Sequence, residues 1–251
     1  RFPESDLTPY TTVMGRGGMA TFLLVHGSFQ GGWIWQPTAN ALRAAGHTVY
    51  APTMEGCGER VHALRAGITV TGAAQELAEL LRHEDLNDVV LVGTSSGGMV
   101  AAKTAELAKA RIARVIFVDA LVPQVGESTK DIVQRGNADP YEMSEFARGP
   151  TRNDLANRLF GELEGAQKDW ALERATPHPN GLSDVSADEL KAFWADEWPN
   201  SAVIYSVHSE NPPEPHQRRT ADGLKAKWIE MDAGHYPMLT HGEELARLLA
   251  D

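Results

Sequence analysis

The chain has 251 residues, a length that fits one large domain or two small ones. Hydrophobic residues make up 42% and charged residues 23%, and no run of about 18 apolar residues occurs, which argues against a disordered chain and against a membrane span. The net charge of −11 disfavours nucleic acid and membrane surfaces as partners, because both are anionic.

The first residues, 1–18, have neither a basic start nor the apolar stretch of a signal peptide. We expect them to form a flexible arm, with the folded part beginning at Met19. Cys57 is the only cysteine, so the chain can form neither an intramolecular disulfide nor a cysteine-rich zinc site. Nothing in this composition requires an oxidising compartment, and a cytoplasmic location is expected.

Short apolar, β-branched segments alternate with longer amphipathic segments, which is typical of a parallel sheet with crossover helices. The predicted strands are 21–25, 47–51, 88–92, 114–118, 202–207 and 226–230. The predicted helices are 36–45, 71–81, 96–108, 215–223 and 243–249. Thr240 and Glu243 have the spacing of a capping box at the start of the last helix. The order predicts an α/β fold with a mostly parallel six-stranded sheet flanked by helices.

Residues 121–200 interrupt this alternation with a long polar stretch. Because compact domains rarely carry so long a structureless loop, we interpret the stretch as a helical insertion that forms a lid over one end of the sheet. The core is then formed by 19–120 and 201–251. The insertion contains Trp170, Trp194 and Trp198, which we expect to line an apolar substrate pocket; packing between lid and sheet is the alternative.

The sequence Gly93-Thr94-Ser95-Ser96-Gly97 follows a predicted strand and precedes a predicted helix. In that context the pattern G-x-S-x-G indicates a nucleophile elbow, a tight turn that holds the central serine above the sheet at a helix N-terminus. Ser95 is therefore the predicted nucleophile. Ser96 is expected to contribute its backbone N–H to the binding of a developing oxyanion.

A second oxyanion donor is predicted in the glycine-rich loop that follows the first strand, HGSFQGGW. Such a loop at the carboxyl end of a strand can present a free backbone N–H to the same point in space, and we assign that N–H to Ser28. Each donor of this kind is worth about 2.7 to 4 kcal/mol in the transition state.

His235 lies in the segment DAGHYP, after the last predicted strand and before the terminal helix. A general base placed there comes last in the chain order serine, acid, histidine that hydrolases of the α/β type show. Glu210, in the loop after strand 202–207, is our first choice for the acid, and Asp119, at the end of strand 114–118, is the alternative. No H-E-x-x-H or clustered metal-ligand pattern occurs, so no metal is expected.

Taken together, VHGSFQGGW, VGTSSGGM, DALVP, RATPHP and DAGHYPML resemble one branch of the α/β-hydrolase superfamily. That branch holds plant methyl-ester esterases, plant hydroxynitrile lyases and bacterial carboxylesterases, pyrethroid hydrolases among them. The resemblance covers most of 19–251 and implies a short sheet that lacks the first two strands of larger relatives.

The resemblance implies roles for Ser95 as nucleophile, His235 as base, and Ser28 with Ser96 as oxyanion amides. We also expect Gly27, Phe29 and Tyr236 to contact the substrate. Two positions depart from the branch: Thr94 stands where a histidine is usual, and Glu210 stands near the place of the usual aspartate.

The implied activity is that of a serine carboxylesterase that hydrolyses a small to medium ester through an acyl-enzyme, with no cofactor and a small molecule as its partner. A homodimer is left open. One alternative is a hydroxynitrile lyase, but the lyases have threonine and lysine where this chain has Gly27 and Tyr236. The other alternative is a non-catalytic small-molecule receptor on the same fold.

Overall fold

The computed structural model describes residues 18–134, 136, 138–186 and 188–251. Apart from Gly18, the predicted arm lies outside the described residues. In the described part of the chain, six strands form one sheet in the order β2-β1-β3-β4-β8-β9, and every neighbouring pair is parallel. Their bounds are β1 Thr21–Val25, β2 Thr48–Tyr50, β3 Val89–Ser95, β4 Ile112–Ala120, β8 Ala202–Ser206 and β9 Lys227–Met231. The predicted parallel sheet is confirmed.

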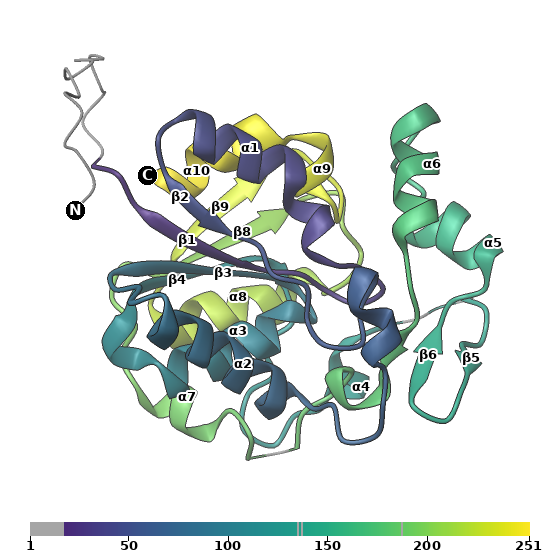
Figure 1. Cartoon of the computed structure of the whole chain (residues 1–251), viewed down its shortest axis with the longest axis horizontal. Coiled ribbons are helices and arrows are strands. Elements are labelled where there is room, and N and C mark those ends of the chain that lie inside the picture. The colour runs from purple at the N-terminus through teal and green to yellow at the C-terminus, as the bar shows by residue number, and fades with distance from the viewer. Residues whose placement is uncertain (1–17, 135, 137, 187) are drawn as a thin grey trace, which may run out of the picture.

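Helices cover both faces of this sheet (Figure 1). One face carries α1 Gln36–Ala44, α9 Pro237–Thr240 and α10 Gly242–Ala250, and the other carries α2 Val70–His83, α3 Gly97–Leu107, α7 Lys191–Ala195 and α8 Glu214–Leu224. Shorter turns of 3₁₀ helix are Gly32–Trp35, Gly58–Ala63, Lys109–Arg111 and Asn180–Leu182, and Leu155–Leu159 is a π-helical turn. The five helices predicted from periodicity are all present, with ends displaced by one or two residues.

The predicted capping box at the last helix is wrong. Thr240 ends the short helix α9, and its hydroxyl donates to the carbonyl of Tyr236 at 3.1 Å, which is one turn back along the same helix. The N-cap of α10 is His241, which makes no side-chain capping bond. The capping pattern failed because Pro237 starts a helical turn three residues before Thr240.

Two apolar cores form, one on each face of the sheet. Successive side chains of a strand point to opposite faces, so Phe22 and Leu24 of β1 enter one core while Leu23 and Val25 enter the other. This double burial explains why the central strands β1 and β3 are mostly apolar instead of alternating with polar residues.

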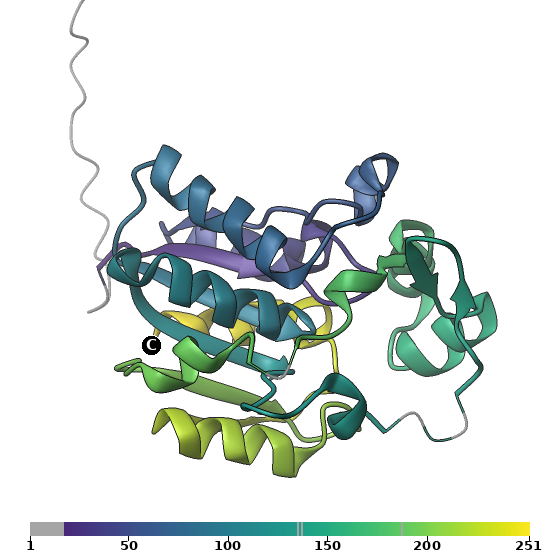
Figure 2. The ribbon, with the colours of Figure 1, turned by 90° about the horizontal axis from the view of Figure 1, so that it is seen from below.

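The insertion lies beyond the carboxyl ends of the main strands (Figures 1 and 2). It contains helices α4 Thr129–Ile132, α5 Arg152–Asp154 and α6 Gly165–Arg174, together with a three-stranded antiparallel sheet of β5 Glu142–Met143, β6 Ala147–Gly149 and β7 His178–Pro179. The predicted insertion is therefore not purely helical. Its last helix, α7, returns to the main sheet, where Phe193 packs edge-on against Phe117 of β4 with ring centroids 6.1 Å apart.

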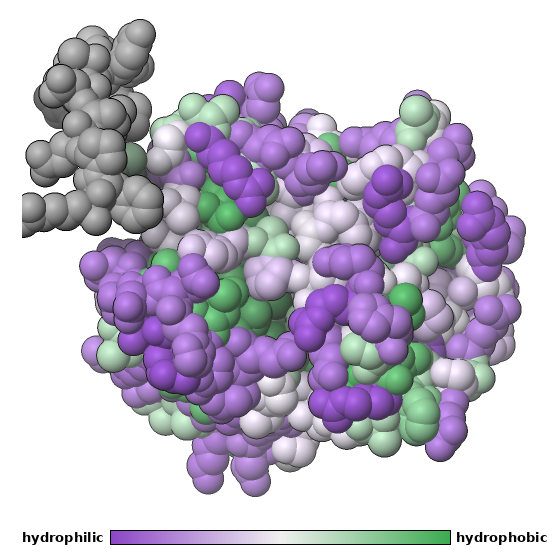
Figure 3. Space-filling view, viewed as in Figure 1, coloured by the Kyte–Doolittle hydropathy of each residue, from purple (hydrophilic) through white to green (hydrophobic). Residues whose placement is uncertain are grey.

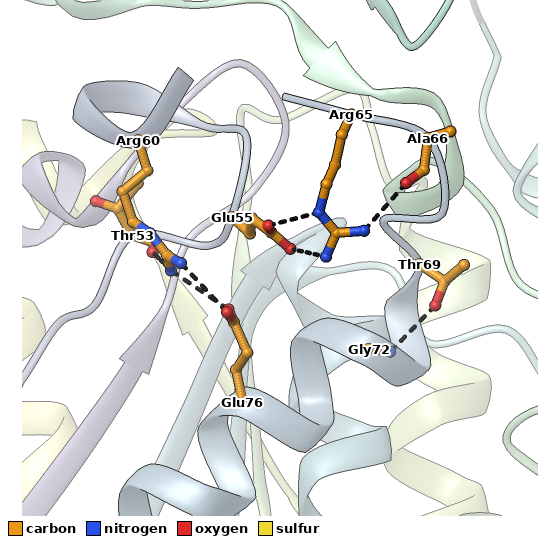
Figure 4. A network of polar contacts seen from close by, with 8 residues as sticks. All are labelled: Thr53, Glu55, Arg60, Arg65, Ala66, Thr69, Gly72 and Glu76. Atoms are coloured by element: carbon orange, nitrogen blue, oxygen red, sulfur yellow. Dashed lines mark hydrogen bonds and ion pairs between the residues drawn. The ribbon is translucent and has the colours of Figure 1, made fainter. Parts of the chain in front are cut away.

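Polar contacts hold the loop between β2 and α2 in place (Figure 4). Arg65 binds both carboxylate oxygens of Glu55 at 2.9 Å, and Arg60 donates to the carbonyl of Thr53 and pairs with Glu76 of α2. Exposed pairs of this kind contribute about 0 to 1 kcal/mol each. Their effect here is to fix the loop that lies beside the glycine-rich loop after β1.

Hydrophilic side chains cover most of the face shown in Figure 3. Exposed large apolar side chains belong to different elements: Met19, Val61, Leu107, Val125, Met143 and Val207. No helix of the described residues has both the length and the apolar character needed to cross a bilayer.

A substitution of Phe117 tests the packing of the central strand β4. We expect Phe117→Ala to lower the free energy of unfolding by about 3 to 5 kcal/mol, because the ring is fully buried and its removal leaves a cavity. Urea unfolding followed by circular dichroism measures the loss. Val125→Ala, at an exposed loop position, is the control and should change the stability by less than about 0.5 kcal/mol. Equal effects of the two substitutions would contradict the assigned core.

Candidate active site

Ser95 ends β3 with a left-handed backbone (φ 50°), which is costly for a residue with a side chain. The glycines two positions before and after it, Gly93 and Gly97, leave room for the chain to make this turn. A Cβ on Gly97 would lie 2.3 Å from the carbonyl oxygen of His26, and a Cβ on Gly93 would lie 2.8 Å from the side chain of Ala101. The predicted strand, tight turn and helix are therefore all present at this motif.

The glycine-rich loop after β1 lies directly against Ser95. A Cβ on Gly27 would be 2.6 Å from the Cβ of Ser95 and 3.1 Å from its hydroxyl oxygen. Gly27 is not among the residues that line the neighbouring cavity, in contrast to its predicted contact with the substrate. The absence of a side chain at Gly27 instead lets the loop approach the serine.

The N–H groups of Ser28 and Ser96 lie on the two loops that meet at Ser95. Neither N–H donates to a backbone acceptor among the described residues, and the two serine hydroxyls are 2.8 Å apart. Ser96 is also the N-cap of α3, whose 11 residues direct the positive end of the helix dipole toward this point. Two backbone donors next to Ser95 can stabilise a developing oxyanion.

His26 holds the glycine-rich loop without taking part in the chemistry. Its Nε2 accepts the N–H of Met54 at 3.0 Å, so its Nδ1 carries the proton and donates to the carbonyl of Gly27 at 2.9 Å. Burial lowers the pKa of His26 to about 4, so the ring is neutral at physiological pH. The loop after β2, fixed by the ion pairs of Figure 4, thus supports the loop that carries Ser28.

His235 lies in the loop after β9 and donates from Nδ1 to Oδ2 of Asp119 at 2.5 Å. Burial alone would lower the pKa of His235, but the hydrogen bond and the charge of Asp119, together with the charge of Glu162, raise the pKa above its ordinary value. With Nδ1 engaged, Nε2 is the ring nitrogen available to accept a proton. Ser95 and His235 line the same cavity.

Asp119 reaches His235 because β4 contains a bulge. Thr94 pairs with Val118 and Ser95 with Ala120, so Asp119 is the extra residue, and its φ is 45°. The carboxylate is completely buried, and the amide of Gln217 in α8 donates to its other oxygen at 2.6 Å. Both carboxylate oxygens therefore have a donor, as a buried charge requires.

The structure corrects the predicted partner of His235, because Asp119 takes the place expected for Glu210. Glu210 lines the same cavity, but its side chain is exposed and makes no hydrogen bond to His235 among the described residues. The residue of this loop that faces the imidazole is Ser209, whose hydroxyl lies 3.4 Å from Nδ1. Glu210 is one position too far along the chain.

Gln30 and Tyr236 link the loop after β1 to the loop after β9, a pairing for which we found no signal in the sequence. The amide oxygen of Gln30 accepts the N–H of Gly27 at 3.1 Å, and its side chain also hydrogen bonds to the phenol of Tyr236. The Tyr236 ring contacts the imidazole of His235 edge-on at 4.9 Å. Burial raises the pKa of the phenol, so it stays protonated.

The cavity that contains these groups has a volume of about 590 Å³. Residues of the predicted site that line it are Ser28, Phe29, Ser95, Ser96, Glu210, His235 and Tyr236. The insertion supplies much of the remaining wall, including Val133, Tyr141, Asn157, Leu159 and Glu162. This size and mixed polarity suit a small organic molecule.

The three tryptophans of the insertion do not line this cavity, contrary to their predicted role. Trp170 packs edge-on against Trp33 with ring centroids 5.2 Å apart. Trp194 donates from its indole nitrogen to a backbone carbonyl at 2.7 Å, and Trp198 stacks on Phe193 in the core. Their amphipathic rings serve packing, the alternative considered above.

No group of three potential ligands among the described His, Cys, Asp and Glu residues is arranged to hold a metal ion. The polar groups of the site are the hydroxyl of Ser95, the imidazole of His235 with its buried partner Asp119, and the backbone amides of Ser28 and Ser96. This set can perform nucleophilic acyl transfer, with the imidazole moving the proton and the amides binding the oxyanion.

A family model described as "Alpha/beta hydrolase family" matches residues 22–248. The chain is 30% identical over 244 residues to a carbendazim hydrolyzing esterase of Nocardioides sp. (strain SG-4G), covering 92% of this chain and 99% of that protein. It is 31% identical over 240 residues to an alpha-hydroxynitrile lyase of Arabidopsis thaliana, covering 89% of this chain and 93% of the lyase. An extracellular alpha/beta-hydrolase from a Paenibacillus species has a similar structure, with a TM-score of 0.75 at 24% identity. That similarity covers 92% of this chain and 97% of the hydrolase.

Because Ser95 is partly exposed and lines the cavity, we predict that it reacts with a fluorophosphonate probe and that Ser95→Ala abolishes the labelling. Ser96→Ala should keep most of the labelling, because this substitution removes only the hydroxyl and leaves the backbone N–H in place. In-gel fluorescence and peptide mapping measure the site and extent of the reaction. Labelling of Ser96 in the wild-type protein, or equal loss in both variants, would contradict the assignment.

Proposed function

Because the chain belongs to the alpha/beta hydrolase family, we propose that it is a serine carboxylesterase that cleaves a small to medium ester through an acyl-enzyme. The observation that carries the proposal is the convergence, at one cavity, of a strained Ser95, the hydrogen-bonded pair His235 and Asp119, and the amides of Ser28 and Ser96. The esterase named above, which matches over nearly its full length, supports the same reaction class.

In the acylation step, Oγ of Ser95 attacks the ester carbonyl carbon while Nε2 of His235 takes the hydroxyl proton. The carbonyl oxygen becomes an oxyanion held by the N–H groups of Ser28 and Ser96. When the tetrahedral intermediate collapses, the bond from carbon to the alcohol oxygen breaks. His235 returns the proton to that oxygen, and the alcohol leaves.

Deacylation repeats these steps with water as the nucleophile. His235 accepts a proton from water, the resulting hydroxide attacks the acyl carbon, and the same two amides bind the second oxyanion. The bond from the acyl carbon to Oγ of Ser95 then breaks, His235 returns the proton to Oγ, and the carboxylic acid product is released. Asp119 fixes the tautomer of the imidazole and stabilises its charged form.

The residues that the resemblance implies for lyases of this branch, threonine and lysine, are replaced in this chain by Gly27 and Tyr236. No side chain fits at Gly27 without displacing Ser95, so a threonine hydroxyl has no place there. Tyr236 stands in place of the lysine, and its phenol is buried. A non-catalytic receptor is disfavoured by the full set of catalytic groups. These features support ester hydrolysis over both alternatives.

Residues 121–200 are proposed to act as a lid that shapes the acyl or alcohol pocket. The support for this role is that Val133, Tyr141 and Leu159 of the insertion line the cavity that also contains Ser95 and His235. Apolar side chains at these positions favour an ester with apolar substituents.

We also propose that the protein is located in the cytoplasm, because a chain with a single cysteine does not need an oxidising compartment.

The proposed function predicts burst release of p-nitrophenol from p-nitrophenyl acetate, with one equivalent of product per active site before the slower steady state. A series of p-nitrophenyl esters of increasing acyl length then gives the preferred chain length. Ser95→Ala should lose both the burst and nearly all turnover while keeping the wild-type circular dichroism spectrum. A burst that survives in Ser95→Ala would contradict the mechanism.

Asp119→Asn should lower turnover by about 10⁴-fold, because the amide favours the wrong imidazole tautomer while preserving the shape of the side chain. Glu210→Gln, a charge change of the same size in the same cavity, should cost less than about tenfold. Steady-state kinetics of the two folded variants, measured side by side, decide between the carboxylates. A large loss in Glu210→Gln alone would mean that His235 changes its partner during catalysis.

A further inference from the structure

The insertion contacts the segment that carries His235. We define the lid segment as residues 159–167 and the histidine segment as residues 234–240. The carboxylate of Glu162 accepts the N–H of Tyr236 at 2.6 Å, and the ring of Phe160 packs against the Tyr236 ring with centroids 5.0 Å apart. The amide of Gln167 donates to the carbonyl of Leu239 at 3.0 Å. The lid segment is therefore bonded to the backbone on the carboxyl side of His235.

Glu162 also lies against the backbone on the amino side of the histidine. A Cβ on Gly234 would be 1.5 Å from Oε2 of Glu162, so the carboxylate occupies the space that a side chain would fill there. The two residues that flank His235 thus both contact one carboxylate, through a hydrogen bond at Tyr236 and through close packing at Gly234. This contact explains why the motif DAGHYP has a glycine at position 234, although no turn requires one there.

The same carboxylate acts on the imidazole electrostatically. The charge of Glu162 raises the pKa of His235, and burial raises the pKa of Glu162 itself. The titratable groups that face His235 are Asp119 at the end of β4, Glu162 of the lid segment and the neighbouring Tyr236. Other charged or titratable groups on the wall of the cavity are Lys130, Tyr141, Arg148, Arg158, His208 and Glu210.

We propose that Glu162 is a positioning residue for His235: its carboxylate, delivered by the lid segment, fixes the backbone on both sides of the imidazole and so makes the lid part of the catalytic framework. The inference rests on the proposed function only in taking His235 as the general base. Phe160 precedes Glu162 in the chain and Leu163 follows it. Both side chains are fully buried, and they hold the segment that carries the carboxylate in place. A base held by a rigid backbone keeps its ring aligned with Ser95, and misalignment by about 1 Å can cost 100-fold in rate.

Two substitutions of Glu162 distinguish the effect of its hydrogen bond to Tyr236 from the effect of its negative charge on His235. Glu162→Gln keeps an oxygen that can accept the N–H of Tyr236 but removes the negative charge. Glu162→Ala removes both and leaves that N–H without its acceptor. Glu164→Gln is the matched control, since Glu164 lies two residues away in the same segment, is exposed as Glu162 is, and caps α6 without a side-chain bond, whereas Glu162 accepts the N–H of Tyr236.

For Glu162→Gln we expect the imidazole of His235 to titrate at a lower pH than in the wild type, because the cationic ring loses a favourable charge. The base must be neutral to act, so the acidic limb of the kcat/KM profile for p-nitrophenyl acetate should move to lower pH by the same amount. For Glu162→Ala we expect kcat to fall about 10- to 100-fold with a smaller change in KM. Glu164→Gln should match the wild type in both readouts.

The titration is read by NMR of the His235 ring, assigned as the signal lost in His235→Gln, so it does not depend on any ester being cleaved. If the ring titrates identically in the wild type, Glu162→Gln and Glu164→Gln, the inference is overturned. Undiminished kcat in a folded Glu162→Ala also overturns it. If Glu162→Ala fails to fold, the NMR comparison of the two glutamine variants decides. Failure of the proposed function would appear differently, as a wild-type enzyme without a burst.

Discussion

The hydrogen bond between Nδ1 of His235 and the carboxylate of Asp119 joins residues that are 116 positions apart, and the chemistry of the site depends on it. Asp119 is fully buried, and an ionised carboxylate in such a place is stable only when its oxygens have donors. Two elements meet that requirement, since the loop after β9 supplies the imidazole and α8 supplies the amide of Gln217. The bond therefore requires the correct order of β4, β8 and β9 in the sheet.

The opposite side of the site depends on close backbone approach. Gly97 and Gly27 bring the elbow and the glycine-rich loop against each other, so that the amides of Ser28 and Ser96 flank Ser95. A neutral, buried His26 connects that loop to the loop after β2. Preorganised donors of this kind need no rearrangement when charge develops, which is the main way that such sites lower a barrier. The lid segment completes the arrangement through its contact with the histidine segment.

Local signals in the sequence located the sheet and four of the candidate site residues. The apolar runs located each strand of the main sheet. Ser28, Ser95, Ser96 and His235 lie at or after the ends of strands, and they gather because the carboxyl ends of parallel strands share one edge. The acid could not be ranked in the same way. Asp119 reaches the imidazole through a bulge in β4, a feature of strand pairing that leaves no trace in a single sequence. The roles of Gln217 and Glu162 depend on the same kind of long-range placement, and the tryptophans show that an amphipathic ring near a site is often used for packing.

The most direct measurement of the central claim is the identity of the covalent intermediate. The wild-type enzyme is mixed with a slowly deacylating activated ester, p-nitrophenyl trimethylacetate, quenched in acid during the burst, digested and analysed by mass spectrometry. We predict one trimethylacetyl group per chain, attached to the peptide that contains Ser95 and located on that residue by fragmentation. Turnover of this ester without any acylated peptide, or an acyl group on Ser96, Ser28 or another residue, would contradict the proposed mechanism.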